Sequence, residues 1–579
     1  MTPLSGFSAV LLVAAASCGL FFGTANTLMH VPYAVLLYPA ALYVIGLRSS
    51  TPFRLGWCAG LPGAASCLYW IAVAAHNYGG FPWVLAAPCS ILLGMYVSFW
   101  GGLFAWGVAR MEGFSLWRRV AASGLLWMLL EWIRGWFCTG FPWLTVSSGL
   151  AAWPVLLQPL SLIGTYGYSG CLSAAAFLLC EALGASRVRG CGFCSLLPAL
   201  TAVLLLGLSA GFGAWRLAVL PAKLVEQGVP VAITMVQGNV RQDVKWSKEH
   251  QLLTLEKYLR LSAEAVRADV EAVRQASASG RATSTPSAIS VSQALGLPVG
   301  SSNDPSLAPA LPDMLLWPET AMPFAYPSSA FSGELRSFVS GLSIPLVFGA
   351  PGLEYRPGGR DLFNRAFMLR PEGDAGHYDK EHLVPFGEYL PPVLDWKIFE
   401  PLLQGLGGFT KGGDDELFVL TPGGRPSVPM GMLICYEAIF PELARERVAD
   451  GAQILLNVSN DAWYDFTSAP MQHLHLSLMR AVEQGRWVAR STNSGITAFL
   501  DPLGGVHAMG EASDGWALFK DGALTGTVLA LQEHTPYFYA HPWLPALAAL
   551  LLAALCLPLL SHSRLFGRKD RYIKERNFS

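Results

Sequence analysis

Residues 429–443 read PMGMLICYEAIFPEL, an apolar run that ends in one cysteine, Cys435, shortly before a segment that begins at Pro441. A short apolar run bounded in this way is typical of a buried strand, and Pro-Glu favours the first turn of a helix. The stretch therefore predicts a strand, a thiol and a helix, as in α/β folds. A thiol near a helix N-terminus is expected to have a lowered pKa and to react as a thiolate.

The distribution of the other cysteines decides how Cys435 is interpreted. The chain has 11 cysteines, and all except Cys435 lie in or beside long apolar segments, where cysteine behaves as a small hydrophobic residue. Cys435 is the only one between residues 221 and 541. It has no local partner for a disulfide, so the alternatives are a buried structural residue and a nucleophile.

Charge is spread unevenly along the chain. Asp, Glu, Lys and Arg make up 14% of the 579 residues, yet residues 1–200 hold only eleven of them. A membrane-spanning helix needs about 20 mostly apolar residues. We expect a multi-pass helical membrane bundle with spans near 7–25, 31–47, 53–75, 81–109, 120–137, 157–184, 194–220 and 542–560. The net charge of −1 offers no basic field for nucleic acid.

Arginines in alternate loops predict the orientation, because Lys and Arg are enriched on the cytoplasmic side of a membrane. They follow the second, fourth and sixth expected spans, and the intervening loops contain neither Lys nor Arg. A basic tail follows the last span: Arg564, Arg568, Lys569, Arg571, Lys574 and Arg576. We expect both ends of the chain in the cytoplasm and residues 221–541 outside it.

From Val229 onward, short apolar strands alternate with polar helices, which indicates an α/β layered domain. The expected division is a transmembrane region at 1–220, an exported α/β domain at 221–541, and a final span with its basic tail at 542–579. Residues 277–311 are rich in Ser, Ala, Pro and Gly and are interpreted as a flexible insertion. Neither a G-x-G-x-x-G motif nor a P-loop is present, so the pattern names no cofactor.

Two further strand ends carry ionisable residues. Glu319 follows the apolar run of DMLLWPE, where a carboxylate suits a general base. Lys380 ends a candidate hairpin, and Glu388 lies eight residues later. A Cys nucleophile, a carboxylate base and an ammonium that stabilises an oxyanion are sufficient for acyl transfer through a thioester. His473 and His475 are two residues apart, a spacing that suits packing on a helix better than a metal pair.

Several motifs resemble one family closely. WPET, HYDKEHLVPFGEYL and ICYEAIFPE are similar to the Glu, Lys and Cys segments of the nitrilase, or carbon–nitrogen hydrolase, superfamily. Four others resemble its membrane branch, the apolipoprotein N-acyltransferases: VQGNVRQDVKW, NVSNDAWYD, EWIRGWFCTGFPWL and the QH (Gln472-His473) of MQHLHLSLMRAVEQGRWVARSTNSG. The chain departs from that pattern at Tyr464 and Asp465, where the family often has an aromatic residue and Gly, and in the length of the 277–311 insertion.

The resemblance implies a nitrilase-type α-β-β-α sandwich and a role for each matching residue. Glu319 would be the general base, Lys380 the oxyanion stabiliser and Cys435 the acylated nucleophile. Glu388 and Glu437 would support catalysis, while Trp246 and Tyr436 would contact substrate. No cofactor or metal is implied.

The activity implied is the last step of lipoprotein maturation. A phospholipid would donate an acyl chain, and the α-amine of the diacylglyceryl-modified N-terminal cysteine of apolipoproteins would accept it. The protein would lie in a bacterial cell inner membrane with its catalytic domain in the periplasm.

Two other functions stay open on the residues. A membrane-tethered amidase would resolve the thioester with water, and the motif EWIRGWFCTGFPWL disfavours it. A transporter with an external binding domain would need ionisable residues inside its spans. Beyond Glu131 and Arg134 the expected spans hold few central ones.

Overall fold

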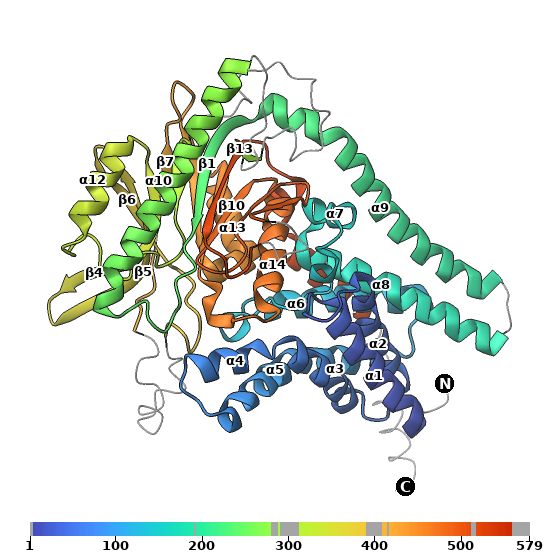
Figure 1. The fold of residues 1–579 in the computed structure, drawn as a ribbon. Helices are drawn as coiled ribbons and strands as arrows, with labels where there is room; N and C mark the ends of the chain where they lie inside the picture. Colours follow the sequence, from blue (N-terminus) through green and yellow to red (C-terminus); the bar gives the residue numbers. More distant parts are fainter. Residues whose placement is uncertain are drawn as a thin grey trace, which may run out of the picture.

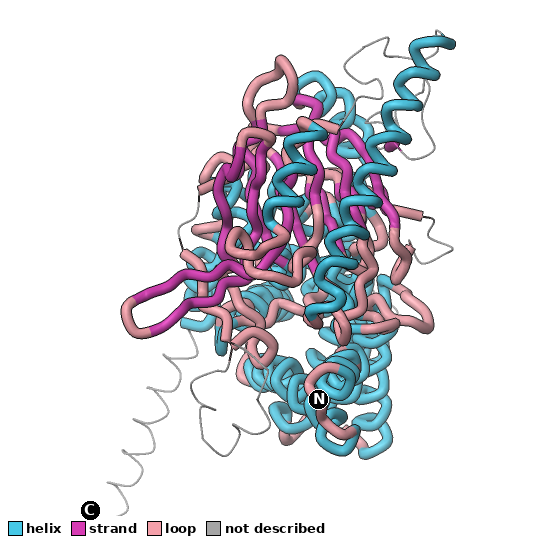
Figure 2. Tube along the Cα trace, turned by 60° about the vertical axis from the view of Figure 1, so that its left-hand side comes forward, coloured by secondary structure: helices cyan, strands magenta, loops and turns pink. Residues whose placement is uncertain are grey.

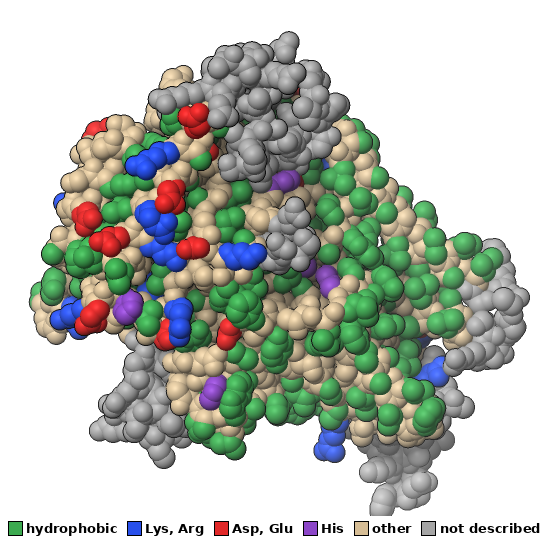
Figure 3. Space-filling view, viewed as in Figure 1, with side chains coloured by type: hydrophobic (Ala, Val, Ile, Leu, Met, Phe, Trp, Pro, Cys, Tyr) green, Lys and Arg blue, Asp and Glu red, His purple; other side chains and the backbone are tan. Residues whose placement is uncertain are grey.

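The computed structural model describes residues 4–189, 193–279, 288–289, 312–389, 408–413, 416–510 and 517–557. Most of the expected 277–311 insertion and the whole basic tail lie outside these residues. The N-terminal part is helical and the part from Val229 onward is an α/β domain (Figure 1). Hydrophobic side chains cover the visible face of the helical part, while charged side chains gather on the α/β domain (Figure 3). The expected fold class is confirmed.

The apolar segments of the N-terminal part all form helices. They comprise α1 (Gly6–Gly23), η1 (Pro32–Leu36), α2 (Leu37–Arg48), α3 (Pro52–Cys67), α4 (Trp70–Asn77), α5 (Trp83–Ala109), α6 (Leu116–Arg134), α8 (Leu160–Arg189) and α9 (Phe193–Gln227). The segment between α6 and α8 contains η2 (Phe137–Thr139), η3 (Ser147–Leu150) and α7 (Pro154–Leu157). A shorter apolar helix covers Leu544–Leu557.

Not all of these helices are long and apolar enough to cross a membrane by themselves. Among the described residues α1, α5, α8 and α9 are, and α3 with α4 form a bent pair, with 51° between the two helices, that adds a fifth candidate. The expected spans at 31–47 and 542–560 correspond to shorter apolar helices. The one at 120–137 corresponds to α6, which carries four charged residues: Arg118, Arg119, Glu131 and Arg134.

Two sheets form the core of the α/β domain. The first has the order β2-β13-β1-β3-β4-β5-β6 and the second β12-β11-β10-β9-β8-β7. Strands of the first are β1 (Val229–Gln237), β2 (Ala288–Ile289), β3 (Met314–Leu316), β4 (Leu346–Arg356), β5 (Gly359–Arg370), β6 (Gly373–Asp379) and β13 (Gly522–Ala530). Strands of the second are β7 (Phe418–Leu420), β8 (Val428–Ile434), β9 (Ile454–Ser459), β10 (Val488–Thr492), β11 (Ala498–Leu500) and β12 (Val506–Ala508).

Helices cover the outer face of each sheet, which gives the expected α-β-β-α sandwich. Helices α10 (Lys248–Ser279) and α12 (Ser332–Leu342) lie over the first sheet (Figure 2). Helices α13 (Pro441–Ala449) and α14 (Ala469–Gln484) lie over the second, on the side of the helical part (Figure 1). Apolar side chains of both sheets, such as Ile233 and Leu456, meet in one buried core. Helix α15 (Pro536–Ala540) contacts α8 and α14.

Strand direction brings the expected site residues to one end of the sandwich. Strand β3 is parallel to β4, and β4 and β6 are both antiparallel to β5, so β3 and β6 run the same way. Glu319 and Lys380 follow their ends, at the same edge of the first sheet. Strand β8, which Cys435 follows directly, belongs to the facing sheet.

Candidate active site

The thiol lies at a sharp turn in the backbone. Strand β8 ends at Ile434, and Cys435 begins the short helix η7 (Cys435–Ile439) with a φ of 52°. A positive φ is uncommon for a residue other than glycine, and such conformations collect at functional sites. Cys435 is only 6% exposed, and the hydroxyl of Ser459, at the end of neighbouring β9, donates to its Sγ at 3.4 Å.

Glu319, Lys380 and Glu388 lie close together beside this turn. Lys380 Nζ lies 2.8 Å from Glu388 Oε1 and 3.5 Å from Glu319 Oε1. The amide Nδ2 of Asn364, on β5, donates to both carboxylates at 2.7 Å. Glu319, Lys380 and Cys435, here called the Glu–Lys–Cys cluster, also interact electrostatically.

The electrostatics of the thiol differ from the expectation. Burial, followed by the charge of Glu319, raises the pKa of Cys435, and the attraction of Lys380 does not offset this. Burial disfavours the charge of Lys380, but Glu388, Glu319 and Cys435 outweigh it and raise its pKa. The expectation of a lowered thiol pKa was therefore wrong. The ammonium is shared between two carboxylates, so Cys435 rests as a thiol and needs a base.

Glu437 connects the turn to the segment after Lys380. Its Oε1 accepts from the backbone N–H groups of Glu381 and His382 at 2.7 and 3.0 Å and from the hydroxyl of Tyr378 at 3.0 Å. Its Oε2 accepts from Ile434 N at 2.7 Å. Burial raises the pKa of Glu437 to about 7, although these donors act in the opposite direction. The side chain thus fixes the spacing between the Cys435 turn and Lys380.

The two residues expected to contact substrate differ in exposure. Tyr436 is buried, and its hydroxyl donates to the carbonyl of Gly140 in the helical part at 3.2 Å. Trp246 is 45% exposed and precedes α10.

Three residues at the site are not singled out by the sequence patterns. Asn364 sits inside a strand, where nothing marks it as a bridge between carboxylates. Lys245 is completely buried, and its Nζ donates to Thr320 Oγ1 at 2.8 Å beside Glu319. His473 was interpreted as packing, yet its Nε2 lies 3.0 Å from the carbonyl oxygen of Cys435. Two sequence signals were available: the motif VKW contains Lys245, and His473 belongs to the QH of MQHLHL.

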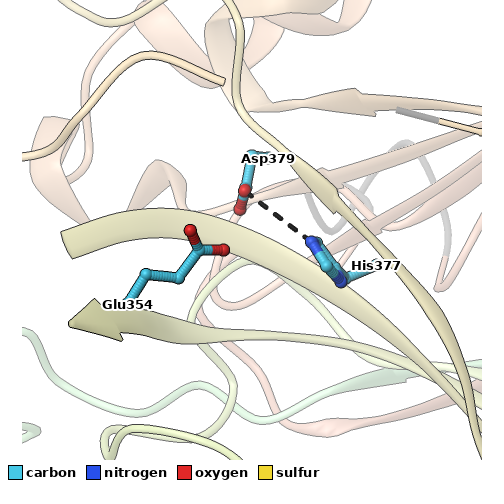
Figure 4. A group of neighbouring side chains, drawn as sticks. All are labelled: Glu354, His377 and Asp379. Carbon is cyan, nitrogen blue, oxygen red and sulfur yellow. Dashed lines mark ion pairs between the residues drawn. The ribbon is translucent and has the colours of Figure 1, made fainter. Parts of the chain in front are cut away.

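One group of potential metal ligands lies near Lys380, formed by Glu354, His377 and Asp379 (Figure 4). Arg365 lies 2.6 Å from both carboxylates, with Nη2 on Glu354 Oε1 and Nε on Asp379 Oδ1. The guanidinium already offsets part of the negative charge that would attract a cation. We interpret the group as an ion-pair network that holds the end of β6.

Comparison with known proteins first identifies the class of protein to which the chain is similar. Residues 232–515 match the family model of the carbon-nitrogen hydrolases, and residues 8–178 match that of the apolipoprotein N-acyltransferase N-terminal domain. Among solved structures, an amidase from Nesterenkonia sp. is 20% identical with a TM-score of 0.29, covering 54% of this chain and 93% of its own.

Relatives that match along almost the whole chain give the particular family. The apolipoprotein N-acyltransferase of Geobacter metallireducens is 31% identical, covering 86% of this chain and 85% of that protein. The Pseudomonas putida protein of the same name is 32% identical over 93% of both. The chain belongs to the apolipoprotein N-acyltransferase family. It is therefore an enzyme of a bacterial membrane-protein family.

Proposed function

We propose that the protein transfers an acyl chain from a phospholipid, through a thioester on Cys435, to the α-amine of the lipid-modified N-terminal cysteine of apolipoproteins. The observation that carries the proposal is the buried Glu–Lys–Cys cluster, in which a thiol, a carboxylate and an ammonium meet. The names of the relatives support the acceptor, and the apolar helices support membrane association. That the acyl donor is a phospholipid is part of this proposal.

The first half-reaction forms the thioester. Glu319 takes the proton of the Cys435 thiol, and Sγ attacks the ester carbonyl of the donor. Once Glu319 is protonated, Lys380 faces only one carboxylate, Glu388, so its charge is available to the oxyanion of the tetrahedral intermediate. When the ester C–O bond breaks, Glu319 returns the proton to the leaving alkoxide, which departs as a lysophospholipid.

The second half-reaction uses the same groups. The amine of the acceptor attacks the thioester carbonyl, and Lys380 again stabilises the oxyanion. The C–S bond breaks, the amine gives up a proton to Glu319, and the proton passes to the departing sulfur. An amide and the resting thiol result, so the kinetics should be ping-pong.

The alternative is hydrolysis of the thioester by water, as in an amidase. An assay that gives the purified protein a phospholipid and a diacylglyceryl-cysteinyl peptide separates the two. Transfer predicts N-acylated peptide and lysophospholipid in equal amounts. Release of free fatty acid without acylated peptide would contradict the proposal and favour the hydrolase.

We further propose an inner-membrane location with residues 221–541 in the periplasm, between a transmembrane region at 1–220 and a final span at 542–560. The arginines of alternate loops and the basic tail support this orientation. Reporter fusions inserted near Ser301 and at the C-terminal tail should report opposite sides of the membrane. Two cytoplasmic signals would overturn the orientation.

A further inference from the structure

Helix α14 runs behind the Cys435 turn and carries two histidines on different faces. His473 points to the turn, with Nε2 3.0 Å from the carbonyl oxygen of Cys435. His475 points to the helical part, where its ring centroid lies 5.7 Å from that of His30. Both side chains are buried, and they differ in what they contact.

The contact to Cys435 fixes one proton of His473. A carbonyl oxygen can only accept a hydrogen bond, so Nε2 must carry the proton. On the other side of the ring, Nδ1 lies 3.0 Å from Asp461 Oδ1 and 3.2 Å from Arg490 Nη2. Burial, and then the charge of Arg490, lower the pKa of His473. The Nε2 proton is present both in the neutral Nε2 tautomer and in the imidazolium, so the hydrogen bond to the Cys435 carbonyl does not depend on the state of Nδ1.

The residues behind the ring leave it little freedom. Arg490 Nη2 donates to Asp461 Oδ2 at 2.7 Å, and all side-chain atoms of both residues are buried. The hydroxyl of Ser459 lies 3.0 Å from Asp461 Oδ1 and 3.4 Å from Cys435 Sγ. The nucleophile is therefore held from two directions, at its sulfur by Ser459 and at its carbonyl by His473, and both lead back to Asp461.

We propose that His473 is a positioning residue for the nucleophile: its Nε2–H holds the 435–436 peptide so that Cys435 keeps its left-handed turn. This inference rests on the proposed role of Cys435. A positive φ at such a residue is strained and persists only when neighbouring groups enforce it. Because the peptide is planar and trans, a carbonyl turned towards α14 also turns the N–H of Tyr436 to the opposite side.

Asn and Gln variants separate positioning from packing. In His473→Gln, the side-chain amide can reach the position of ring Nε2 and donate to the same carbonyl. In His473→Asn, the amide reaches only the position of Nδ1, so Asp461 and Arg490 keep a polar partner but the Cys435 carbonyl loses its donor. His475→Asn is the matched control on the same helix.

The experiment measures the rate of acyl-enzyme formation by rapid quench and intact mass, at several phospholipid concentrations, with the full-length protein in detergent. We expect His473→Asn to slow acylation on the order of 10²-fold at saturating phospholipid, as for a nucleophile displaced by about 1 Å. The half-saturating phospholipid concentration should stay unchanged. His473→Gln should recover most of the rate, and His475→Asn should behave as the wild type.

Three results would overturn the inference: His473→Asn acylating at the wild-type rate, His473→Gln being as slow as His473→Asn, or a loss confined to the half-saturating concentration. If His473→Asn does not fold, His473→Leu takes its place, because leucine also lacks a donor for the Cys435 carbonyl. We then expect His473→Leu to acylate slowly and His473→Gln to recover most of the rate. A wild-type protein that is never acylated at Cys435 would instead refute the proposed function. Alkylation of the Cys435 thiol by iodoacetamide would then still test the positioning, with the same expected order of variants.

Discussion

The ammonium of Lys380 lies 2.8 Å from Oε1 of Glu388, and the two residues are only 1% and 9% exposed. A buried ion pair depends on both partners, because the loss of one leaves an uncompensated charge in a medium of low dielectric constant. This pair keeps Lys380 charged while Glu319 changes its protonation state. Because Lys380 stays charged, it can stabilise the oxyanion in the proposed mechanism.

Removal of the ammonium should therefore affect both folding and chemistry. We expect Lys380→Met to destabilise the protein by about 3–5 kcal/mol, since Glu319 and Glu388 are left without their cation. Acylation should fall by on the order of 10²- to 10³-fold. Unfolding temperature and acyl-enzyme formation measure the two effects, and Lys411→Met, at an exposed lysine, is the control. Near-normal acylation by Lys380→Met would exclude the oxyanion role.

Glu319→Gln should preserve the structure but lose the base. Asn364 can still donate to the amide oxygen of the new side chain, so the fold should be retained. Because burial raises the pKa of Cys435, the variant must rely on the small thiolate fraction, and its acylation should rise about tenfold for each pH unit. The wild type should show a shallower rise. Glu334→Gln, at an exposed position of α12, is the control, and equal pH dependence of all three would contradict the assignment.

The buried side chain of Lys245 should make the stability of the folded protein depend on pH. Burial lowers its pKa to about 7, against the attraction of Glu319, whereas the unfolded chain keeps the ordinary value of 10.5. Below pH 7 both states are protonated; above it the folded state loses its proton first, so stability gains from this residue as pH rises towards 10.5. The unfolding temperature of the wild type, relative to Lys245→Met, should therefore increase from pH 7 to pH 9. A constant difference would mean that Lys245 keeps its charge in the folded state.

Trp246→Ala tests the proposed contact with substrate. The side chain is 45% exposed, so its removal should leave the unfolding temperature nearly unchanged. We expect a higher KM for the lipopeptide or phospholipid, with a smaller change in kcat. Tyr355→Ala removes an even more exposed aromatic side chain, on β4, and serves as the control. Equal kinetics of Trp246→Ala and the wild type would exclude Trp246 from the binding site.

The candidate site illustrates what the sequence could predict. Glu319, Lys380 and Cys435 each follow an apolar strand, and strand ends are visible in a sequence because hydrophobicity stops there. Asn364 lies within a strand, and its link between two carboxylates depends on the pairing of β5 with its neighbours β4 and β6. The α/β fold was predictable for the same reason, because the alternation of apolar strands and polar helices is visible in the hydrophobic pattern.

Other properties depend on three-dimensional surroundings. The raised pKa of the thiol comes from burial by distant segments and from the sharing of Lys380 between carboxylates, neither of which local spacing contains. His473 and His475 lie two residues apart in MQHLHL, and the packing of α14 against the Cys435 turn gives them different contacts.

The intact mass of the protein after incubation with phospholipid tests the central claim most directly. The account predicts a gain of one acyl group, mapped to Cys435, released by hydroxylamine at neutral pH and discharged by a diacylglyceryl-cysteinyl peptide. Cys435→Ser should stay unmodified or form an oxygen ester that discharges slowly. An adduct on another residue, or one that survives hydroxylamine, would contradict the thioester mechanism.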